Sequence, residues 1–184
     1  MARVLLIRHA QSTFQGIDSP LTEEGRRQAD ALAAWLIEHT GIDRIVVSQY
    51  LRALETILPF AKETGIKIEV DPRLGERVLK DGPFIGEDVW LAAVRASIED
   101  PDLRYEGGET GRETLERGWA CLTEALNAPN SLTALVSHGQ MSTHLLRAID
   151  PSFGFREWRA MTNPDVFYIA RGDSGLRFER VWEQ

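Results

Sequence analysis

Two short apolar stretches decide the fold of this chain: RVLLIRHA at residues 3–10 and LTALVSHG at residues 132–139. Each contains a run of aliphatic residues without polar alternation, which is typical of a strand buried on both faces of a parallel sheet. Each run leads to a histidine, His9 or His138. Ligands of open parallel sheets bind beyond the carboxyl ends of the strands. We therefore expect both histidines at the edge of the sheet where a binding site forms.

Strand-like runs alternate with helical patterns along the rest of the chain. Thr22 is the expected N-cap of a first helix that runs to about His39, because its hydroxyl can accept a backbone N–H and two acidic residues follow it. The remaining expected elements are helices over about 51–63, 112–127 and 140–149 and strands over 44–48, 67–70, 166–170 and 176–182, the last two forming a hairpin. This alternation predicts an α/β fold, a three-layer sandwich with a mostly parallel central sheet and helices on both faces.

The segment of residues 71–111 breaks this alternation. It is rich in glycine and proline, and it contains one clear helical pattern, over about 87–99. Long excursions between sheet elements are usually functional or disordered, and Trp90, Leu91 and Tyr105 supply side chains that can pack. We expect residues 71–111 to form a lid-like insertion over the strand ends, within a single domain of residues 1–184.

Composition excludes several classes of protein. A chain of 184 residues with 43% hydrophobic residues suits one domain with a substantial core. The net charge of -7 argues against general binding of nucleic acid or of an anionic membrane, which requires a basic face. A predicted strand begins at residue 3 and no apolar run approaches the roughly 18 residues of a membrane span, so we expect a cytoplasmic protein. Cys121 is the single cysteine, which excludes an intramolecular disulfide and a multi-cysteine metal cluster.

Two arginines are expected at the same edge as the histidines. Arg8 directly precedes His9, and Arg52 lies about one turn into the helix that follows strand 44–48. A guanidinium group matches phosphate oxygens in a bidentate manner, and a neutral imidazole can attack phosphorus. The convergence of these arginines with His9 and His138 therefore predicts phosphoryl transfer through a phosphohistidine.

Several short motifs occur in a characteristic order. They are RHAQS at residues 8–12, PLTEEG at 20–25, SQYLRALET at 48–56, LGE at 74–76, GGET at 107–110 and VSHG at 136–139. This ordered set resembles the motifs of the histidine phosphatase superfamily, also called phosphoglycerate mutase-like. The resemblance covers nearly the whole chain.

The resemblance implies roles for individual residues. His9 would be the phosphorylated nucleophile, with Arg8 and Arg52 on the phosphate, Glu76 as the acidic proton donor and His138 as the second histidine of the site. A hydrogen bond from the other ring nitrogen of His9 to a backbone carbonyl would fix its neutral tautomer. The two arginines, together with His138 if it is protonated, would neutralise the oxygens of the moving phosphoryl group.

The chain departs from the family pattern at two positions. Ala10 stands where a glycine usually follows the nucleophile, so this position cannot easily adopt a positive φ. Gln15 stands where many members carry an asparagine that contacts phosphate, and we treat Gln15 as a phosphate-binding candidate. Gly139 and Gln140 begin a predicted helix, whose N-terminal N–H groups attract anions. Gly139 is therefore a further phosphate-binding candidate.

These residues predict a hydrolase, a phosphatase that cleaves small phosphorylated metabolites through a phosphohistidine on His9. We expect it to need no metal ion, because the arginines and His138 supply the positive charge that a metal would bring. We also expect no bound cofactor.

Two alternatives remain open. The first is a cofactor-dependent phosphoglycerate mutase, although the chain is shorter than such mutases usually are. The second is a catalytically idle phosphate-binding or adaptor module that kept the fold. A serine hydrolase is disfavoured because the chain has no Gly-x-Ser-x-Gly elbow, and a metal hydrolase because its four histidines show no His-x-x-x-His or His-x-Asp spacing.

Overall fold

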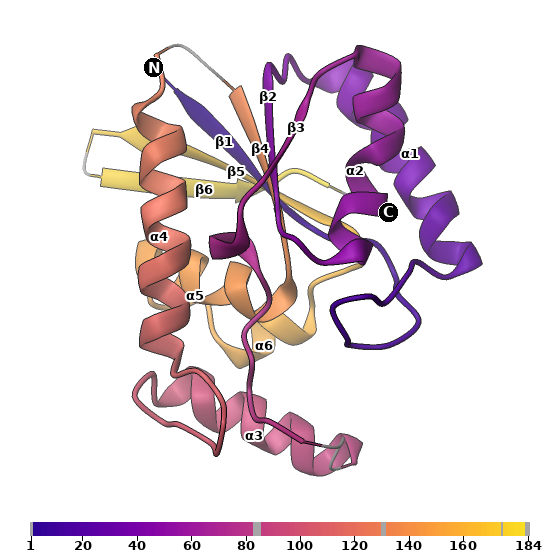
Figure 1. Cartoon of the computed structure of the whole chain (residues 1–184). Coiled ribbons are helices and arrows are strands. Elements are labelled where there is room, and N and C mark those ends of the chain that lie inside the picture. The colour runs from indigo at the N-terminus through magenta and orange to yellow at the C-terminus, as the bar shows by residue number, and fades with distance from the viewer. Residues whose placement is uncertain (1, 83–85, 130–131, 174, 183–184) are drawn as a thin grey trace.

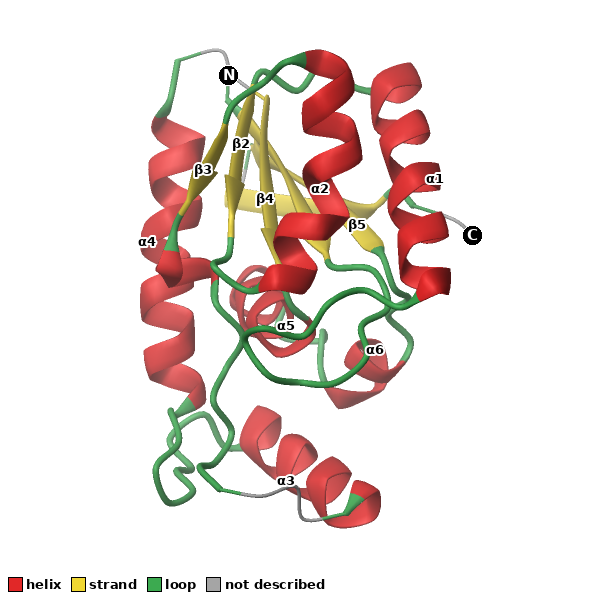
Figure 2. Ribbon diagram, turned by 45° about the vertical axis from the view of Figure 1, so that its right-hand side comes forward, coloured by secondary structure: helices red, strands yellow, loops and turns green. Residues whose placement is uncertain are grey.

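A six-stranded sheet forms the middle layer of the protein, seen in two views of the computed structural model in Figures 1 and 2. The structure describes residues 2–82, 86–129, 132–173 and 175–182. The strands are β1 (Arg3–Arg8), β2 (Arg44–Val47), β3 (Ile68–Val70), β4 (Leu132–Ser137), β5 (Asp165–Gly172) and β6 (Gly175–Arg180). Their order is β3-β2-β4-β1-β5-β6, with the first four parallel and β5 antiparallel to both of its neighbours. The expected mostly parallel sheet and the C-terminal hairpin are confirmed.

Helices cover both faces of this sheet. They are α1 (Glu23–His39), α2 (Leu51–Thr64), α3 (Glu87–Glu99), α4 (Gly111–Asn127), α5 (Gly139–Ile149) and α6 (Phe155–Arg159), and a short 3-10 helix, η1 (Pro72–Leu74), follows β3. Helices α1 and α2 lie on one face of the sheet, and α4 and α5 lie on the other (Figure 1). The chain therefore has the three-layer α/β architecture that its sequence predicts.

The aliphatic run of β1 supplies both hydrophobic cores. Leu5 and Ile7 pack into the core beneath α1 and α2. Val4 and Leu6 pack into the opposite core, beneath α4 and α5. Successive side chains of a strand point to opposite faces, so a strand covered on both sides needs apolar residues at every position. This explains why the run shows no polar alternation.

The sequence signals for helix ends are largely confirmed. Thr22 caps α1, since its hydroxyl accepts the backbone N–H of Gly25 at 2.9 Å, and the helix ends at His39 as expected. Helices α4 and α5 each begin one residue earlier than expected, at Gly111 and Gly139. Within the described ranges, no helix combines the length and the apolar character that crossing a membrane requires.

Three details differ from the sequence analysis. Helix α6 is not predicted, because five residues are too few for a helical period to be recognised. Arg52 is the second residue of α2 rather than a full turn into it, so its side chain starts from the helix N-terminus. Strand β6 ends at Arg180, and Trp182, expected in that strand, packs into the core beneath α1 and α2.

The strand order brings distant segments to one edge. Strand β4 lies between β1 and β2 and is parallel to both. The carboxyl ends of these three strands therefore lie next to one another at the same edge of the sheet. The N–H of His9 donates to the carbonyl of Ser137 at 3.0 Å, and the N–H of Ser48 donates to that of Val136 at 3.0 Å. His9, His138 and Ser48 thus follow three adjacent strands at their carboxyl ends.

Residues 71–111 leave the sheet after β3 and return to it at α4. The expected helix over about 87–99 is confirmed as α3. Figures 1 and 2 both place α3 beyond the carboxyl ends of the parallel strands. Trp90 of α3 packs against Trp158 of α6, with 5.7 Å between ring centroids. The segment therefore lies at the edge where the histidines emerge.

Candidate active site

His9 follows β1 and is held in one tautomer. Its Nδ1 lies 2.6 Å from the carbonyl oxygen of Ala10. A carbonyl oxygen only accepts hydrogen bonds, so Nδ1 carries the proton and Nε2 carries the lone pair. Burial, together with the neighbouring charge of Arg52, lowers the pKa of His9 to about 3. The ring is therefore neutral near pH 7, and Nε2 carries the lone pair that can attack an electrophile.

Arg52 reaches His9 from the start of α2. Its Nε donates to Nε2 of His9 at 3.1 Å, and its Nη1 donates to the carbonyl oxygens of Gln15 and Gly16 at 3.1 and 2.8 Å. Its Nη2 is buried and has no hydrogen-bond partner among the described residues. A guanidinium with unused donors thus lies beside the unprotonated nitrogen of His9, which suits an anion at this place.

Arg8 approaches the same place from the end of β1. Its Nη1 donates to the carbonyl of Met161 at 3.1 Å, while its Nε is buried without a partner among the described residues. A Cβ added to Gly139 would lie 3.4 Å from both Cζ and Nε of Arg8 and 3.1 Å from Nε1 of Trp158. The missing side chain of Gly139 therefore makes room for two donor groups.

His138 lies behind His9 rather than on a cavity wall. The two rings meet edge to face, with 5.1 Å between their centroids, and Nε2 of His138 lies 2.7 Å from Oγ of Ser48. Burial, reinforced by His9 and Arg52, lowers the pKa of His138 well below its usual value. His138 is therefore neutral near pH 7 in this structure, so the positive charge beside His9 comes from the arginines and not from a protonated His138.

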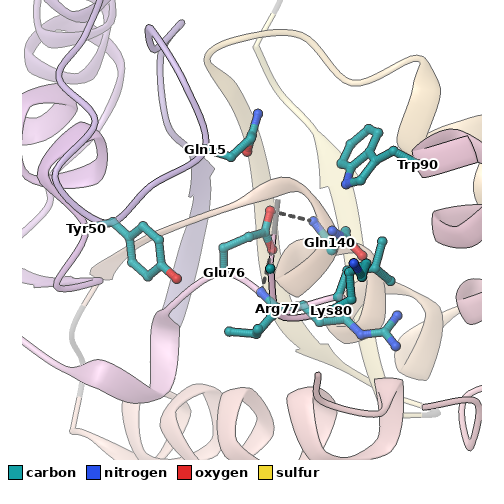
Figure 3. Close-up of a pocket in the computed structure, with 10 residues that line it drawn as sticks. Gln15, Tyr50, Glu76, Arg77, Lys80, Trp90 and Gln140 are labelled. Carbon is teal, nitrogen blue, oxygen red and sulfur yellow. Dashed lines mark hydrogen bonds between the residues drawn. The ribbon is translucent and has the colours of Figure 1, made fainter. Parts of the chain in front are cut away.

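Glu76 follows η1 and faces the start of α5. Its Oε1 accepts the backbone N–H groups of Arg77 and Met141 at 2.9 and 3.1 Å, and its Oε2 accepts that of Gln140 at 3.3 Å. Figure 3 marks the bonds from Arg77 and Gln140. From the sequence, the N-terminus of this helix is expected to attract an anion. In the structure, the carboxylate of Glu76 takes the N–H of Gln140, while Gly139 lies beside it on the cavity wall.

Two adjoining cavities open at this edge. The smaller, of about 120 Å³, is lined by Arg8, His9, Gly139 and Trp158 among others. The larger, of about 260 Å³, includes Tyr50, Arg77 and Lys80 in its wall. The two share four wall residues: Gln15, Glu76, Trp90 and Gln140. Glu76 thus belongs to the walls of two cavities, one whose wall includes His9 and one that is large enough for a small organic group. Figure 3 shows the residues around Glu76 in the larger cavity.

The family model described as "Histidine phosphatase superfamily (branch 1)" matches residues 4–183. The chain belongs to the histidine phosphatase superfamily. The resemblance seen in the sequence is confirmed, and so is the fold that it implies.

Relatives within the histidine phosphatase superfamily carry two kinds of name. A probable phosphoglycerate mutase, GpmB, from Yersinia enterocolitica is 32% identical over 164 residues, which are 81% of this chain and 75% of the relative. A mycobacterial glucosyl-3-phosphoglycerate phosphatase solved with inorganic phosphate is 27% identical, with a TM-score of 0.78 over 99% of this chain and 97% of that one. YhfR from Bacillus stearothermophilus has a TM-score of 0.80 at 24% identity over 98% of this chain and 96% of that one, which shows the shared fold.

The predicted site residues of this superfamily member meet in space. Arg8, His9 and Glu76 line the smaller cavity, and Arg52 and His138 are fully buried directly behind His9. Gln15 and Gly139, the two further phosphate-binding candidates, also belong to the wall of that cavity. His144, which is predicted from the sequence to be a structural or partly exposed residue, is buried against Gly111.

The departure at Ala10 is absorbed locally. Its side chain is buried with Leu21 and Ala29, and its N–H donates to Oγ1 of Thr56 at 2.9 Å.

Asn163 is a site residue that was not predicted from the sequence. Its Nδ2 donates to the carbonyl of His9 at 2.8 Å. A polar residue placed just before β5 was the one available sequence signal. Within the described part of the chain, no group of three or more His, Cys, Asp or Glu side chains is arranged to hold a metal ion.

Proposed function

We propose that this protein is a metal-independent phosphatase that hydrolyses small phosphorylated metabolites through a phosphohistidine on His9. One observation carries the proposal above the others. His9 is a neutral imidazole whose Nδ1–H is held by the carbonyl of Ala10 and whose Nε2 accepts a hydrogen bond from Arg52. A nucleophile with a fixed tautomer, next to a guanidinium that has an unused hydrogen-bond donor, suits attack on a phosphate ester.

In the first step, the lone pair on Nε2 of His9 forms the N–P bond while the P–O bond to the leaving group breaks. The free donors of Arg8 and Arg52 stabilise the charge on the phosphoryl oxygens. Glu76 donates its proton to the departing oxygen, so that an alcohol leaves through the larger cavity.

In the second step, a water molecule takes the place of the alcohol. The carboxylate of Glu76 accepts a proton from this water, whose oxygen attacks phosphorus, and the N–P bond breaks to release inorganic phosphate. His9 returns to its neutral form and Glu76 to its protonated form, so both are ready for another cycle.

His138 acts from behind His9 in this proposal. Burial among arginines keeps its ring neutral in the free protein. A bound phosphate dianion adds negative charge nearby and favours the imidazolium form. We therefore propose that His138 gains a proton when phosphate binds and so balances part of its charge.

The names of the relatives leave a choice between hydrolysis and a mutase reaction, and the larger cavity favours hydrolysis. A mutase has to hold a second phosphate during transfer. Nε and Nη2 of Arg77 already donate to the carbonyl of Glu109, at 3.1 and 2.8 Å. Lys80 and the buried Nη1 of Arg77 are then the cationic donors of that wall that no described residue engages. One lysine and one nitrogen of Arg77 offer a second dianion fewer donors than Arg8 and Arg52 offer the first.

The proposal includes three predictions made from the sequence. Residues 1–184 act as one domain in which residues 71–111 serve as a lid, the place of action is the cytoplasm, and the partner is a small phosphorylated metabolite. The match of the family model to residues 4–183 supports the first of these.

A screen against a panel of cellular phosphomonoesters tests the proposal. Phosphate release and kcat/KM are measured for each ester with the wild-type protein and with His9→Ala. We expect release of inorganic phosphate from at least one ester and none with His9→Ala. Formation of an isomeric phosphate ester instead would identify a mutase, and phosphate binding without turnover of any ester would identify an idle module.

A further inference from the structure

Arg117, in the middle of α4, holds the backbone that carries Glu76. Its Nη1 donates to the carbonyl oxygens of Arg73 and Gly75 at 2.8 and 2.7 Å. Its Nη2 donates to the carbonyl oxygen of Glu76 itself at 3.3 Å. One guanidinium therefore fixes three carbonyl groups along the stretch that leads to the Glu76 side chain.

Glu109 binds the same guanidinium group of Arg117 through its carboxylate. Its two carboxylate oxygens accept Nε and Nη2 of Arg117 at 2.9 and 2.8 Å. Oε2 of Glu109 also accepts the N–H of Val78 at 3.1 Å, and the N–H of Glu109 donates to the carbonyl of Val78 at 2.7 Å. The chain is thus held both just before and two residues after Glu76.

The Arg117–Glu109 pair is well suited to hold this stretch. The two side chains are only 22% and 28% exposed, so solvent screens their attraction less than that of a surface pair. Burial alone would raise the pKa of Glu109, but the hydrogen bonds from Arg117 hold it below its usual value. Glu109 is therefore an ionised anchor, and it does not offer a proton to a substrate.

Glu76 depends on such an anchor. Residues 75–82 contain no helix or strand, so no ladder of backbone hydrogen bonds fixes them. Among the described residues, the carboxyl of Glu76 bonds only to backbone N–H groups, those of Arg77, Gln140 and Met141. Its position is then set by the path of the backbone, and a misplacement of 1 Å can cost about 10²-fold in rate.

We propose that Arg117 and Glu109 are positioning residues for the proton donor Glu76. The inference rests on the proposed function, because it assigns the pair to the protonation of the leaving group. The pair does not touch the substrate, since neither residue lines the two cavities. It acts by keeping the carboxyl of Glu76 between the cavity that contains His9 and the cavity that takes the leaving group.

The test compares two substrates that depend differently on a proton donor. An alkyl phosphate needs protonation of its leaving oxygen, whereas an activated aryl phosphate releases a stable anion. We expect Arg117→Ala to lower kcat/KM for the alkyl ester by about 10- to 10²-fold, the range for a misplaced catalytic group. The aryl ester should change by less than about 3-fold, and inhibition by vanadate should be retained. Glu109→Gln and Arg117→Lys keep part of the contact and should give intermediate losses.

Arg112→Ala is the matched control. Arg112 lies on the same helix, and its guanidinium pairs with Asp102 at 2.7 Å on the surface, away from Glu76. This variant removes an ion pair of α4 without touching the backbone of residues 73–78, so it should leave both substrates unchanged. Urea unfolding of every variant shows how much each ion pair contributes to stability.

A double-mutant cycle decides whether the pair acts through Glu76. In a Glu76→Gln background, Arg117→Ala should slow the alkyl ester no further, because the group that it positions is already absent. Additive losses, or equal losses on both esters, would overturn the inference and leave the pair a structural one. A Glu76→Gln variant without any selective loss would instead remove the proton-donor role, and with it the inference.

Discussion

Arg52 donates a hydrogen bond from Nε to the unprotonated Nε2 of His9 over 3.1 Å. The lone pair that attacks phosphorus in the proposed mechanism therefore accepts a hydrogen bond from a guanidinium group. In that mechanism, a phosphate group that accepts the donors of Arg52 in place of His9 leaves Nε2 available for the attack.

The first prediction is a covalent phosphohistidine. A phosphate-labelled ester should leave label on the protein that is stable in alkali and labile in acid, because the neutral Nε2 of His9 is the available nucleophile. The measurement is label retained after quenching in either medium. His9→Ala is the control and should carry none; label that persists in this variant would place the nucleophile elsewhere.

A second prediction concerns metals. The guanidinium groups of Arg8 and Arg52 already supply positive charge at the proposed phosphate site, so turnover should not need a divalent ion. The rate should stay the same after incubation with EDTA. A large loss that added Mg²⁺ or Zn²⁺ restores would contradict the mechanism.

A third prediction tests Glu76 alone. Glu76→Gln should slow hydrolysis of an alkyl phosphate by about 10²- to 10⁴-fold, the usual contribution of a positioned general acid. An activated aryl ester should lose less, provided that phosphorylation of His9 limits its rate. Vanadate should still bind, because Arg8 and Arg52 remain. Equal and small losses on both esters would mean that Glu76 is only a carboxylate of the lid.

A fourth prediction links the buried histidines to stability. Burial lowers the pKa of His9 to about 3 and that of His144 to about 4, and it lowers the pKa of His138 well below its usual value. As pH falls below about 6.5, the ordinary pKa of histidine, these histidines bind protons in the unfolded chain but stay neutral in the folded protein. The free energy of unfolding must therefore decrease. Each such histidine contributes a slope of up to about 1.4 kcal/mol per pH unit between the two pKa values.

The measurement is urea unfolding at several pH values from 7 to 5. His144→Gln removes one of the three histidines, so the slope should become smaller in this variant than in the wild-type protein. If the variant keeps the slope of the wild-type protein, His144 titrates normally and the prediction is wrong.

A fifth prediction concerns Gly139. Alanine there would bring a Cβ to 3.1 Å from Nε1 of Trp158, so this donor must shift from its place at the cavity wall, while the 3.4 Å approach to Arg8 is an ordinary contact. We expect vanadate to bind about 10-fold more weakly, the loss of one good charge-assisted hydrogen bond. Gly41→Ala is the matched control, since no atom lies within 4 Å of its added Cβ. Unchanged vanadate affinity in Gly139→Ala would show that Nε1 of Trp158 does not hold the anion.

The sequence by itself determined the layers of this protein and the members of its site. Unbroken aliphatic runs require strands buried on both faces, and the carboxyl ends of parallel strands share an edge. This local pattern was enough to bring His9, His138 and the two arginines together, and the ordered motifs added Glu76.

Only the tertiary structure decided how these groups are held and charged. The protonation state of His138 depends on burial by neighbours that come from several separate segments, and the N–H of Gln140 is taken by Glu76, which lies 64 residues earlier in the chain. The contact of Arg117 with the carbonyls of residues 73–76 spans more than 40 residues and carries no local signature. Such contacts depend on how the helices pack in three dimensions, and a sequence pattern records only which face of a helix is apolar.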